Sequence, residues 1–186
     1  MTIRSVQAIS RKGPDIIVLN VNEIPDRIGF YFAGFVDGEG SFNLTFRRRN
    51  DYKLPWKVSL CLNVSQKDEA ILALLKKHLG CGSIRNKGGG VWMFEVNNIQ
   101  AIQENVIPFF QRFGFLSSKK QRDFMIFQQM AERLAAGSHL TRDGIAELLR
   151  MREKMNDGGK RKYSESEIMS AFDVGESPET IRQIPE

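Results

Sequence analysis

Two acidic residues stand close together at the end of an apolar, glycine-rich segment of the sequence. Asp37 and Glu39 alternate with glycines in the run VDGEG. A carboxylate beside apolar residues needs water, a cation or a hydrogen-bond donor to offset the cost of its burial. These acids can therefore cap a turn, or they can bind a hard divalent cation, because Mg²⁺ accepts one or two protein carboxylates and keeps several water ligands.

Small residues run through the same segment. Ala33, Gly34, Gly38 and Gly40 have no bulky side chain, and glycines in particular let another backbone approach closely. The pattern predicts a helix that pairs with a second helix and carries the two acids at one end.

A second set of polar side chains alternates with apolar ones along two predicted strands and a predicted hairpin. Arg and Lys bind guanine and phosphates, Asn binds adenine, and Ser and Thr bind several base edges. A solvated outer sheet face is the alternative, but this set holds five cations and no carboxylate, which favours a nucleic-acid partner. The residues expected to contact DNA are Asn43, Thr45, Arg47, Arg49, Lys57, Ser59, Asn63, Arg85 and Lys87.

The overall composition is that of an ordinary folded protein with a mild preference for polyanions. The 186 residues are 41% hydrophobic and 26% charged, with a formal net charge of +5. No stretch approaches the roughly 20 consecutive apolar residues that a membrane-spanning helix needs, so we expect no membrane partner. Two cysteines and two histidines argue against a disulfide framework and a structural zinc site, and they favour a reducing compartment.

The hydrophobic periodicity predicts an α+β protein whose antiparallel sheet has one apolar and one polar face. Strands are expected at residues 41–49 and 57–64, and a glycine turn at 88–90 joins two hairpin strands at 83–87 and 91–96. Helices are expected after an N-cap at Asp26 up to the glycines 38 and 40, and at about 68–79, 99–113, 118–136, 141–155 and 164–172. The resulting order is αββαββα with additional C-terminal helices.

We divide the chain into an N-terminal extension (residues 1–25), a core (26–137) and a C-terminal helical segment (138–186). The extension is basic and has no long apolar run, so it is either a cleaved transit peptide or a flexible or strand-like arm. The run from Lys160 to Lys162 either contacts phosphates or forms a solvated turn, which is the commoner role of a short charge run.

The segment from Phe32 to Gly40, FAGFVDGEG, resembles the signature of the LAGLIDADG homing endonucleases. Ser41 and Phe42 follow it, as such residues do in that family where the first DNA-facing strand begins. The resemblance extends over residues 26–135 and includes the αββαββα order. It implies the LAGLIDADG fold with a saddle-shaped antiparallel sheet, and a site-specific double-strand DNA endonuclease that hydrolyses phosphodiester bonds.

The resemblance also implies an active site. Glu39 stands at the metal-binding acid position and, with the adjacent Gly38, forms the expected site for Mg²⁺ or another divalent cation such as Mn²⁺. Gln66 resembles the polar residue that the family places at the end of the second strand, and Lys120 resembles a basic residue near the scissile phosphate. Lys119 is the alternative lysine, and either can be an ordinary exposed residue. An alanine four residues after the glutamine departs from close family members that carry an arginine there, so the basic shell is incomplete.

The motif occurs once, and family members with one motif form homodimers through their motif helices. We therefore expect Ala33, Gly34 and Asp37 at a dimer interface, two copies of Glu39 at the twofold axis, and a long pseudo-palindromic target. The alternative is a non-cleaving binder such as an intron RNA maturase, with intron RNA as partner, although the intact acid favours cleavage. An intein-embedded enzyme is disfavoured because the chain is short and has no terminal Cys or Asn. The expected location is intracellular, in a bacterial cytoplasm, a chloroplast or a mitochondrion.

Overall fold

The computed structural model describes residues 19–49, 55–159 and 161–173, so residues 1–18 of the extension and Lys160 of the basic run lie outside the described part. The strands are β1 (Gly40–Arg48), β2 (Trp56–Gln66), β3 (Ser83–Gly88) and β4 (Val91–Val96). The helices are α1 (Asp26–Glu39), α2 (Glu69–Leu79), α3 (Ile99–Ala101), α4 (Ile107–Phe113), α5 (Ser118–Ala135), α6 (Arg142–Lys154) and α7 (Glu165–Asp173). The predicted αββαββα order with further C-terminal helices is confirmed.

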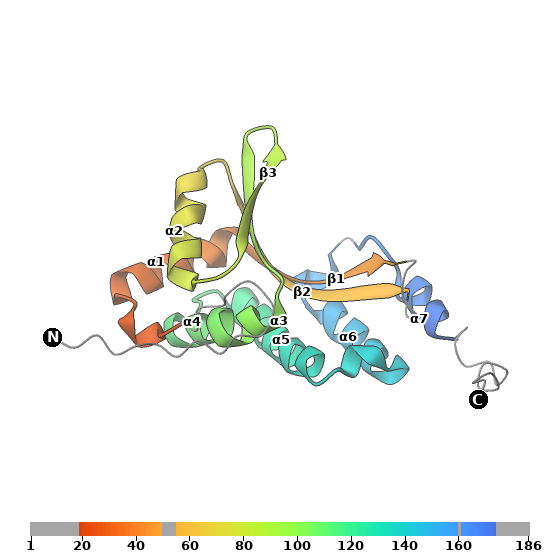
Figure 1. The fold of residues 1–186 in the computed structure, drawn as a ribbon. Helices are drawn as coiled ribbons and strands as arrows, with labels where there is room; N and C mark the ends of the chain where they lie inside the picture. The colour runs from red at the N-terminus through yellow and green to blue at the C-terminus, as the bar shows by residue number, and fades with distance from the viewer. Residues whose placement is uncertain (1–18, 50–54, 160, 174–186) are drawn as a thin grey trace, which may run out of the picture.

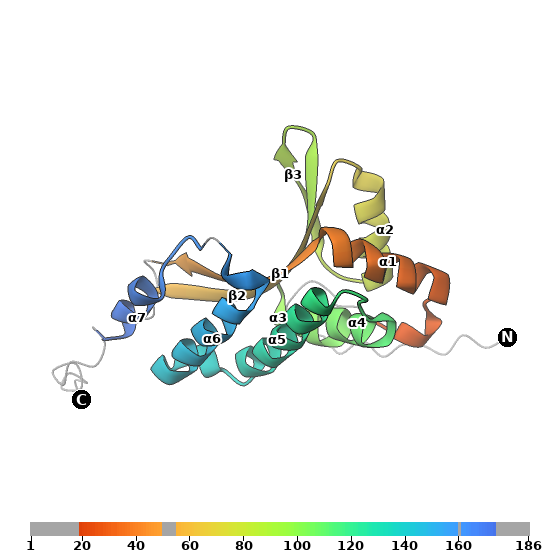
Figure 2. The same cartoon turned by 180° about the vertical axis from the view of Figure 1, so that it is seen from behind.

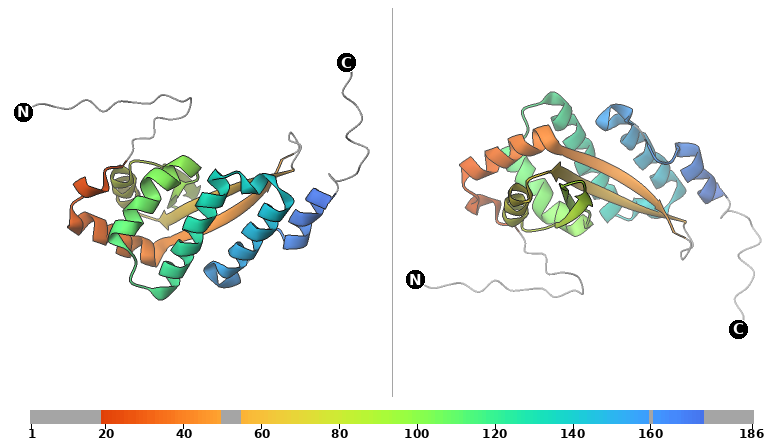
Figure 3. Two further views of the ribbon diagram at one scale, coloured as in Figure 1. Left: turned by 90° about the horizontal axis from the view of Figure 1, so that it is seen from below. Right: turned by 90° about the horizontal axis from the view of Figure 1, so that it is seen from above.

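The four strands form one antiparallel sheet in the order β1-β2-β4-β3. Alternate residues of β1 and β2 point to one face and are buried, among them Phe42, Leu44, Leu60 and Leu62. The helices α3 to α6 lie against this face, while the opposite face of β1 and β2 is open and the β3–β4 hairpin rises beside it (Figures 1 and 3). A sheet with one buried and one open face explains the alternation of the sequence.

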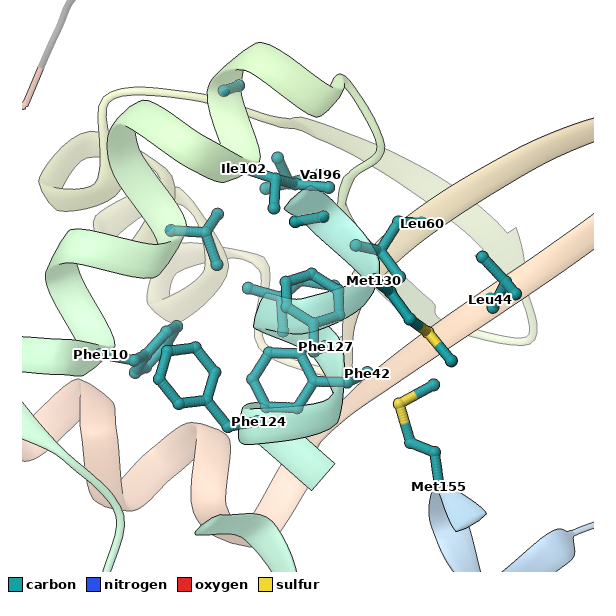
Figure 4. Packing of buried hydrophobic residues seen from close by; sticks show 14 of the residues in the cluster. Phe42, Leu44, Leu60, Val96, Ile102, Phe110, Phe124, Phe127, Met130 and Met155 are labelled. Carbon is teal, nitrogen blue, oxygen red and sulfur yellow. The ribbon is translucent and has the colours of Figure 1, made fainter. Parts of the chain in front are cut away.

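The core joins the sheet to the helices through aromatic rings. Phe42 of β1 lies 4.6 Å from Phe127 of α5, measured between ring centroids, and 6.2 Å from Phe110 of α4. Met155, which follows α6, points into the same cluster (Figure 4). Seen from behind, α5 and α6 pack side by side (Figure 2). The helices beyond residue 137 therefore share one core with the rest of the described chain.

Two helix predictions are corrected. The N-cap of α1 is Pro25, not Asp26, which instead forms the first helical residue. The predicted helix 99–113 contains a π-helical stretch, Ile102–Val106, between α3 and α4. Pro108 follows this stretch at the start of α4; since a proline ring would collide with the carbonyl four residues earlier in a regular α-helix, the wider turn accommodates it. Among the described helices, none is long and apolar enough to cross a membrane.

Gly29 on α1 packs directly under the ring of Phe113, and an added Cβ there would overlap the ring. We expect Gly29→Ala to lower the free energy of unfolding by about 1–3 kcal/mol, because overpacking outweighs the gain in helix propensity. Urea unfolding measures the change. In a Phe113→Ala background the same substitution should no longer destabilise the protein, and equal losses in both backgrounds would contradict the packing explanation.

Candidate active site

The two acids of the motif have different surroundings at the end of α1. Asp37 accepts hydrogen bonds from the backbone N–H groups of Leu116 (3.2 Å) and Ser117 (3.0 Å) and from the Ser117 hydroxyl. Burial opposes ionisation of this carboxyl, but the hydrogen bonds and the nearby Lys120 ammonium together lower its pKa. Because Ser117 is the N-cap of α5, Asp37 attaches the start of α5 to the last turn of α1.

Glu39 is exposed and ends α1, and Gly40 begins β1 with its N–H bonded to the carbonyl of Val36. The C-terminus of a helix carries a partial negative charge that favours cations. Within the described residues, no group of three or more His, Cys, Asp or Glu is arranged to hold a metal ion. Since Asp37 is engaged by Leu116 and Ser117, the end of α1 offers the carboxylate of Glu39 and the backbone of the neighbouring Gly38. This donor set fits Mg²⁺ bound largely by water and completed by a second carboxylate.

The structure distinguishes the two candidate lysines. Lys120 is half-buried, and its ammonium donates a hydrogen bond to the carbonyl of Gly40, next to Glu39. Burial lowers the pKa of Lys120, although the carboxylates of Asp37 and Asp123 act in the opposite direction. Lys119 instead lies on the surface, 2.6 Å from the carboxylate of Asp157, and this hydrogen bond raises its pKa. Only Lys120 of the pair therefore reaches the end of α1.

Gln66 is the last residue of β2 and lies opposite Trp92 of β4. The β1–β2 register pairs Gly40 with Val64, so Gln66 is at the same end of the sheet as Glu39. Its half-buried side chain belongs by alternation to the face of Val64, not to the polar face. In the described part of the chain, no hydrogen bond joins it to Glu39.

The register brings the predicted DNA-contacting residues of β1 and β2 onto the open face. Arg47 pairs with Lys57, Thr45 with Ser59, and Ser41 with Asn63. Arg49 directly follows β1, where its backbone N–H bonds to the carbonyl of Pro55. In the hairpin, Arg85 lies opposite Met93 and Lys87 is exposed close to the glycine turn. The polar residues thus form one surface that runs from the β1–β2 pair to the hairpin.

This surface also holds an acid that the sequence interpretation left out. Glu95 of β4 pairs with Asn63 of β2 and binds Arg85 with an N–O distance of 2.8 Å. Asn97 donates a second hydrogen bond to the same carboxylate at 2.7 Å. The expectation of a face without carboxylates was therefore wrong. Glu95 alternates with the apolar residues Phe94 and Val96 in the predicted hairpin strand 91–96, and that alternation was the available signal.

The solvent-exposed side of α1 carries large aromatic residues and glycines. Phe30 and Tyr31 are 58% and 53% exposed. Leu116, which precedes α5 and donates to Asp37 at the end of α1, is 98% exposed. Gly34 and Gly38 have open space where a side chain would project. Ala33, in contrast, is buried within the protomer, which corrects its expected place on this outer side. An exposed apolar surface with small residues at its centre is typical of a helix-packing interface.

Comparisons with known proteins agree with this architecture. The model of the family described as LAGLIDADG endonuclease matches residues 32–131. A relative from Neurospora crassa, "Probable intron-encoded endonuclease 2", is 30% identical over 141 residues, which cover 73% of this chain and 31% of the relative. "DNA endonuclease I-CvuI" from Chlorella vulgaris is 35% identical over 92 residues, 46% of this chain and 57% of the relative.

A solved structure has a similar fold. The archaeal intron-encoded homing endonuclease I-Vdi141I, complexed with DNA, superposes with a TM-score of 0.71 at 27% identity, covering 81% of this chain and 97% of the other. The curated relatives are longer: the chain spans 31% and 24% of the two Neurospora endonucleases it matches.

Proposed function

Because this chain belongs to the LAGLIDADG endonuclease family, we propose that it is a site-specific double-strand DNA endonuclease. The observation that carries the proposal is the convergence of Glu39 and Lys120 at one end of the β1–β2 pair, where Lys120 donates to the carbonyl of Gly40. The names of the relatives, and the DNA in the complex of I-Vdi141I, support the same substrate class. The activity is hydrolysis of phosphodiester bonds at a long target that the sheet reads through its polar side chains.

The sheet face supplies the contacts that a DNA duplex requires. Arg47, Lys57 and Lys87 are exposed cations on that face, and such groups bind phosphates and guanine edges. Glu95 binds Arg85 and so orients its guanidinium group. The N–H donors of Arg85 that Glu95 does not use then point in a fixed direction and can bind a base. We infer that the β1–β2 pair and the hairpin lie along the major groove, with Asn43, Thr45, Ser59 and Asn63 between the cations.

The protein acts as a homodimer through α1. At the end of α1 Asp37 is engaged by α5 and Glu39 is exposed, so a cation site there with two copies of this acid needs the Glu39 of a second chain. The exposed apolar side of α1, with open space at Gly34 and Gly38, provides the surface on which two such helices can pack. A twofold axis there brings the two acids together and gives a pseudo-palindromic target.

Each functional residue has a stated role in the reaction. A divalent cation bound by Glu39 and the Gly38 backbone would supply Lewis acidity and an activated water. Lys120 donates to the scissile phosphate, where its ammonium stabilises the negative charge that develops in the transition state. Gln66 orients the attacking water. These roles use Mg²⁺ or Mn²⁺ as the cation, and they leave Lys119 outside the reaction.

The two lysines provide a matched test of this assignment. We expect Lys120→Met to slow cleavage about 100-fold, as removal of one stabilising donor typically does, and Lys119→Met to retain the wild-type rate. Single-turnover cleavage at fixed Mg²⁺ concentration measures both. A large loss in Lys119→Met alone, or equal losses in both variants, would overturn the assignment.

The pH dependence of cleavage gives the same residue a second signature. Since burial lowers the pKa of Lys120, its ammonium loses the proton at a lower pH than an ordinary lysine. The charged form is the active one, so wild-type cleavage should decline on the alkaline side earlier than that of Lys120→Arg, whose guanidinium stays protonated. Superimposable alkaline profiles would contradict a role for the Lys120 charge.

The proposed activity is tested by incubating the purified protein with a library of randomised DNA duplexes, with Mg²⁺ or with a chelator. Metal-dependent cutting of one long, nearly symmetric sequence is the expected result. Enrichment of bound but uncut DNA in the presence of Mg²⁺ would instead identify a non-cleaving binder.

A further inference from the structure

The turn that follows α6 is attached to α5 and lies at the free edge of β1. Asn156 and Asp157 both adopt left-handed backbone conformations, with φ of 55° and 51°. The backbone N–H of Asn156 donates to the buried carboxylate of Asp123 at 3.2 Å. Asp157 binds Lys119 and Arg122 of the same helix, each at 2.6 Å. Several independent contacts therefore fix the position of this turn.

The side chain of Asn156 reaches from the turn to the sheet. Its amide nitrogen Nδ2 donates to the backbone carbonyl of Phe42 at 2.7 Å and lies 3.4 Å from Oδ1 of Asn43. A carbonyl can only accept a hydrogen bond, so Asn156 has to present its NH₂ group there. The same NH₂ group faces Asn43, which must then present its oxygen.

This sequence of hydrogen bonds fixes the direction of the Asn43 amide. With Oδ1 turned to Asn156, Nδ2 of Asn43 donates to the hydroxyl oxygen of Ser41 at 3.0 Å. Each of the two amide atoms keeps one further hydrogen-bonding site, because an amide oxygen has two lone pairs and an NH₂ group has two hydrogens. Asn43 belongs to the open polar face and is partly exposed. It thus offers an acceptor and a donor, side by side and in a fixed order.

We propose that Asn156 is a positioning residue for target specificity: by holding the Asn43 amide in one orientation, it makes that side chain read an adenine. Adenine presents the N7 acceptor and the N6 donor side by side in the major groove, and an oriented asparagine binds both. An amide released from Asn156 can turn by 180° and exchange its donor and acceptor, which removes the preference. The inference rests on the proposed function, and Asn156 lies outside the segment that matches the family model, residues 32–131.

Two substitutions at this position separate orientation from simple packing. Asn156→Gly keeps the left-handed backbone and removes the side chain. Asn156→Asp keeps the shape and also tolerates the left-handed conformation, but it replaces the donor by a carboxylate that repels Oδ1 of Asn43. Asp157→Asn, one residue further along the same turn, is the matched control: it removes the ion pairs with Lys119 and Arg122 without touching Asn43.

The experiment selects cleaved or bound sequences from the randomised library with each protein. We expect both Asn156 variants to lose roughly tenfold of the base preference at one position in each half-site, in line with the discrimination of one bidentate contact. Asn43→Ala should alter the same position, and Asn156→Gly should add nothing in that background. Asp157→Asn should keep the wild-type preference. Unchanged preference in both Asn156 variants, or a change spread over many positions, would overturn the inference.

A readout without DNA keeps the inference separate from the proposed function. The side-chain NH₂ resonances of Asn43, observed by ¹⁵N NMR, should move in Asn156→Gly and Asn156→Asp and stay in place in Asp157→Asn. If the wild type selects no DNA, the proposed function fails, while unmoved Asn43 resonances would refute the orientation by Asn156. If the wild type selects a site and the Asn156 variants select the same one, the inference alone fails.

Discussion

Glu39→Gln is expected to abolish cleavage while leaving the fold and DNA binding intact. The side chain is exposed at the end of α1, so an uncharged side chain of the same shape disturbs no packing. The loss removes the carboxylate proposed to hold the cation, whose charge stabilisation is worth several kcal/mol, so we expect the single-turnover rate to fall by about 1000-fold or more. Cleavage and binding of the selected target are measured side by side over a range of Mg²⁺ concentrations.

The other acid of the motif provides the contrast. Asp37 accepts three hydrogen bonds from Leu116 and Ser117, which are shared between its two carboxylate oxygens. Asp37→Asn should lower the melting temperature, because it replaces one of these oxygens by an NH₂ group, which cannot accept a hydrogen bond. Glu39→Gln should melt like the wild type. Normal Mg²⁺-dependent cutting by Glu39→Gln would refute the metal site, and a lowered melting temperature for Glu39→Gln alone would give that residue a structural role.

Gly34→Leu should convert the proposed dimer into a folded monomer that no longer cuts. A side chain at this position meets no atom of the protomer within 4 Å, and leucine favours a helix over glycine by nearly 1 kcal/mol. The protomer should therefore be at least as stable as the wild type. A leucine on this side of α1 prevents the close approach of a second helix, and each protomer alone supplies only one Glu39.

Sedimentation equilibrium and cleavage at equal protomer concentration measure the effect of Gly34→Leu. The matched control is Ala73→Leu, a change from a small to a large exposed side chain on another helix, α2, which should remain dimeric and active. A wild-type protein that is monomeric with its target bound, or a Gly34→Leu variant that stays dimeric and active, would remove α1 from the interface.

Local sequence patterns predicted most of the secondary-structure elements. The change of period after Gly40, from helical to strictly alternating, fixed the boundary between α1 and β1 almost to the residue. The glycine turn at 88–90 likewise located the β3–β4 hairpin. These features depend on neighbours in the sequence, which is why one chain was enough. The π-helical stretch at Ile102–Val106 depends on how Pro108 is accommodated at the start of α4, and hydrophobic periodicity does not report that.

The candidate site was harder to predict because it depends on contacts distant in sequence. Lys119 and Lys120 are neighbouring residues of the same type, so the sequence alone does not distinguish them. In the structure they differ because Asp157, 38 residues beyond Lys119, binds Lys119. The pairing of Glu95 with Arg85 required the strand register. Asn156 had no signal of its own, since its significance arises from the carbonyl of Phe42 across the fold.

The two attachments between α5 and the junction of α1 with β1 have an evolutionary consequence. Asp37 accepts a hydrogen bond from Ser117 at the start of α5, and Lys120 of α5 donates one to Gly40, the residue after Glu39. These contacts hold Glu39 and Lys120 close together. None of these contacts involves the β3–β4 hairpin, whose tip of three glycines faces open space. Substitutions at the hairpin tip can therefore accumulate without displacing Glu39 or Lys120. If the protein is the endonuclease proposed above, its lineage can change the recognised DNA sequence at the hairpin tip while Glu39 and Lys120 keep their relative position.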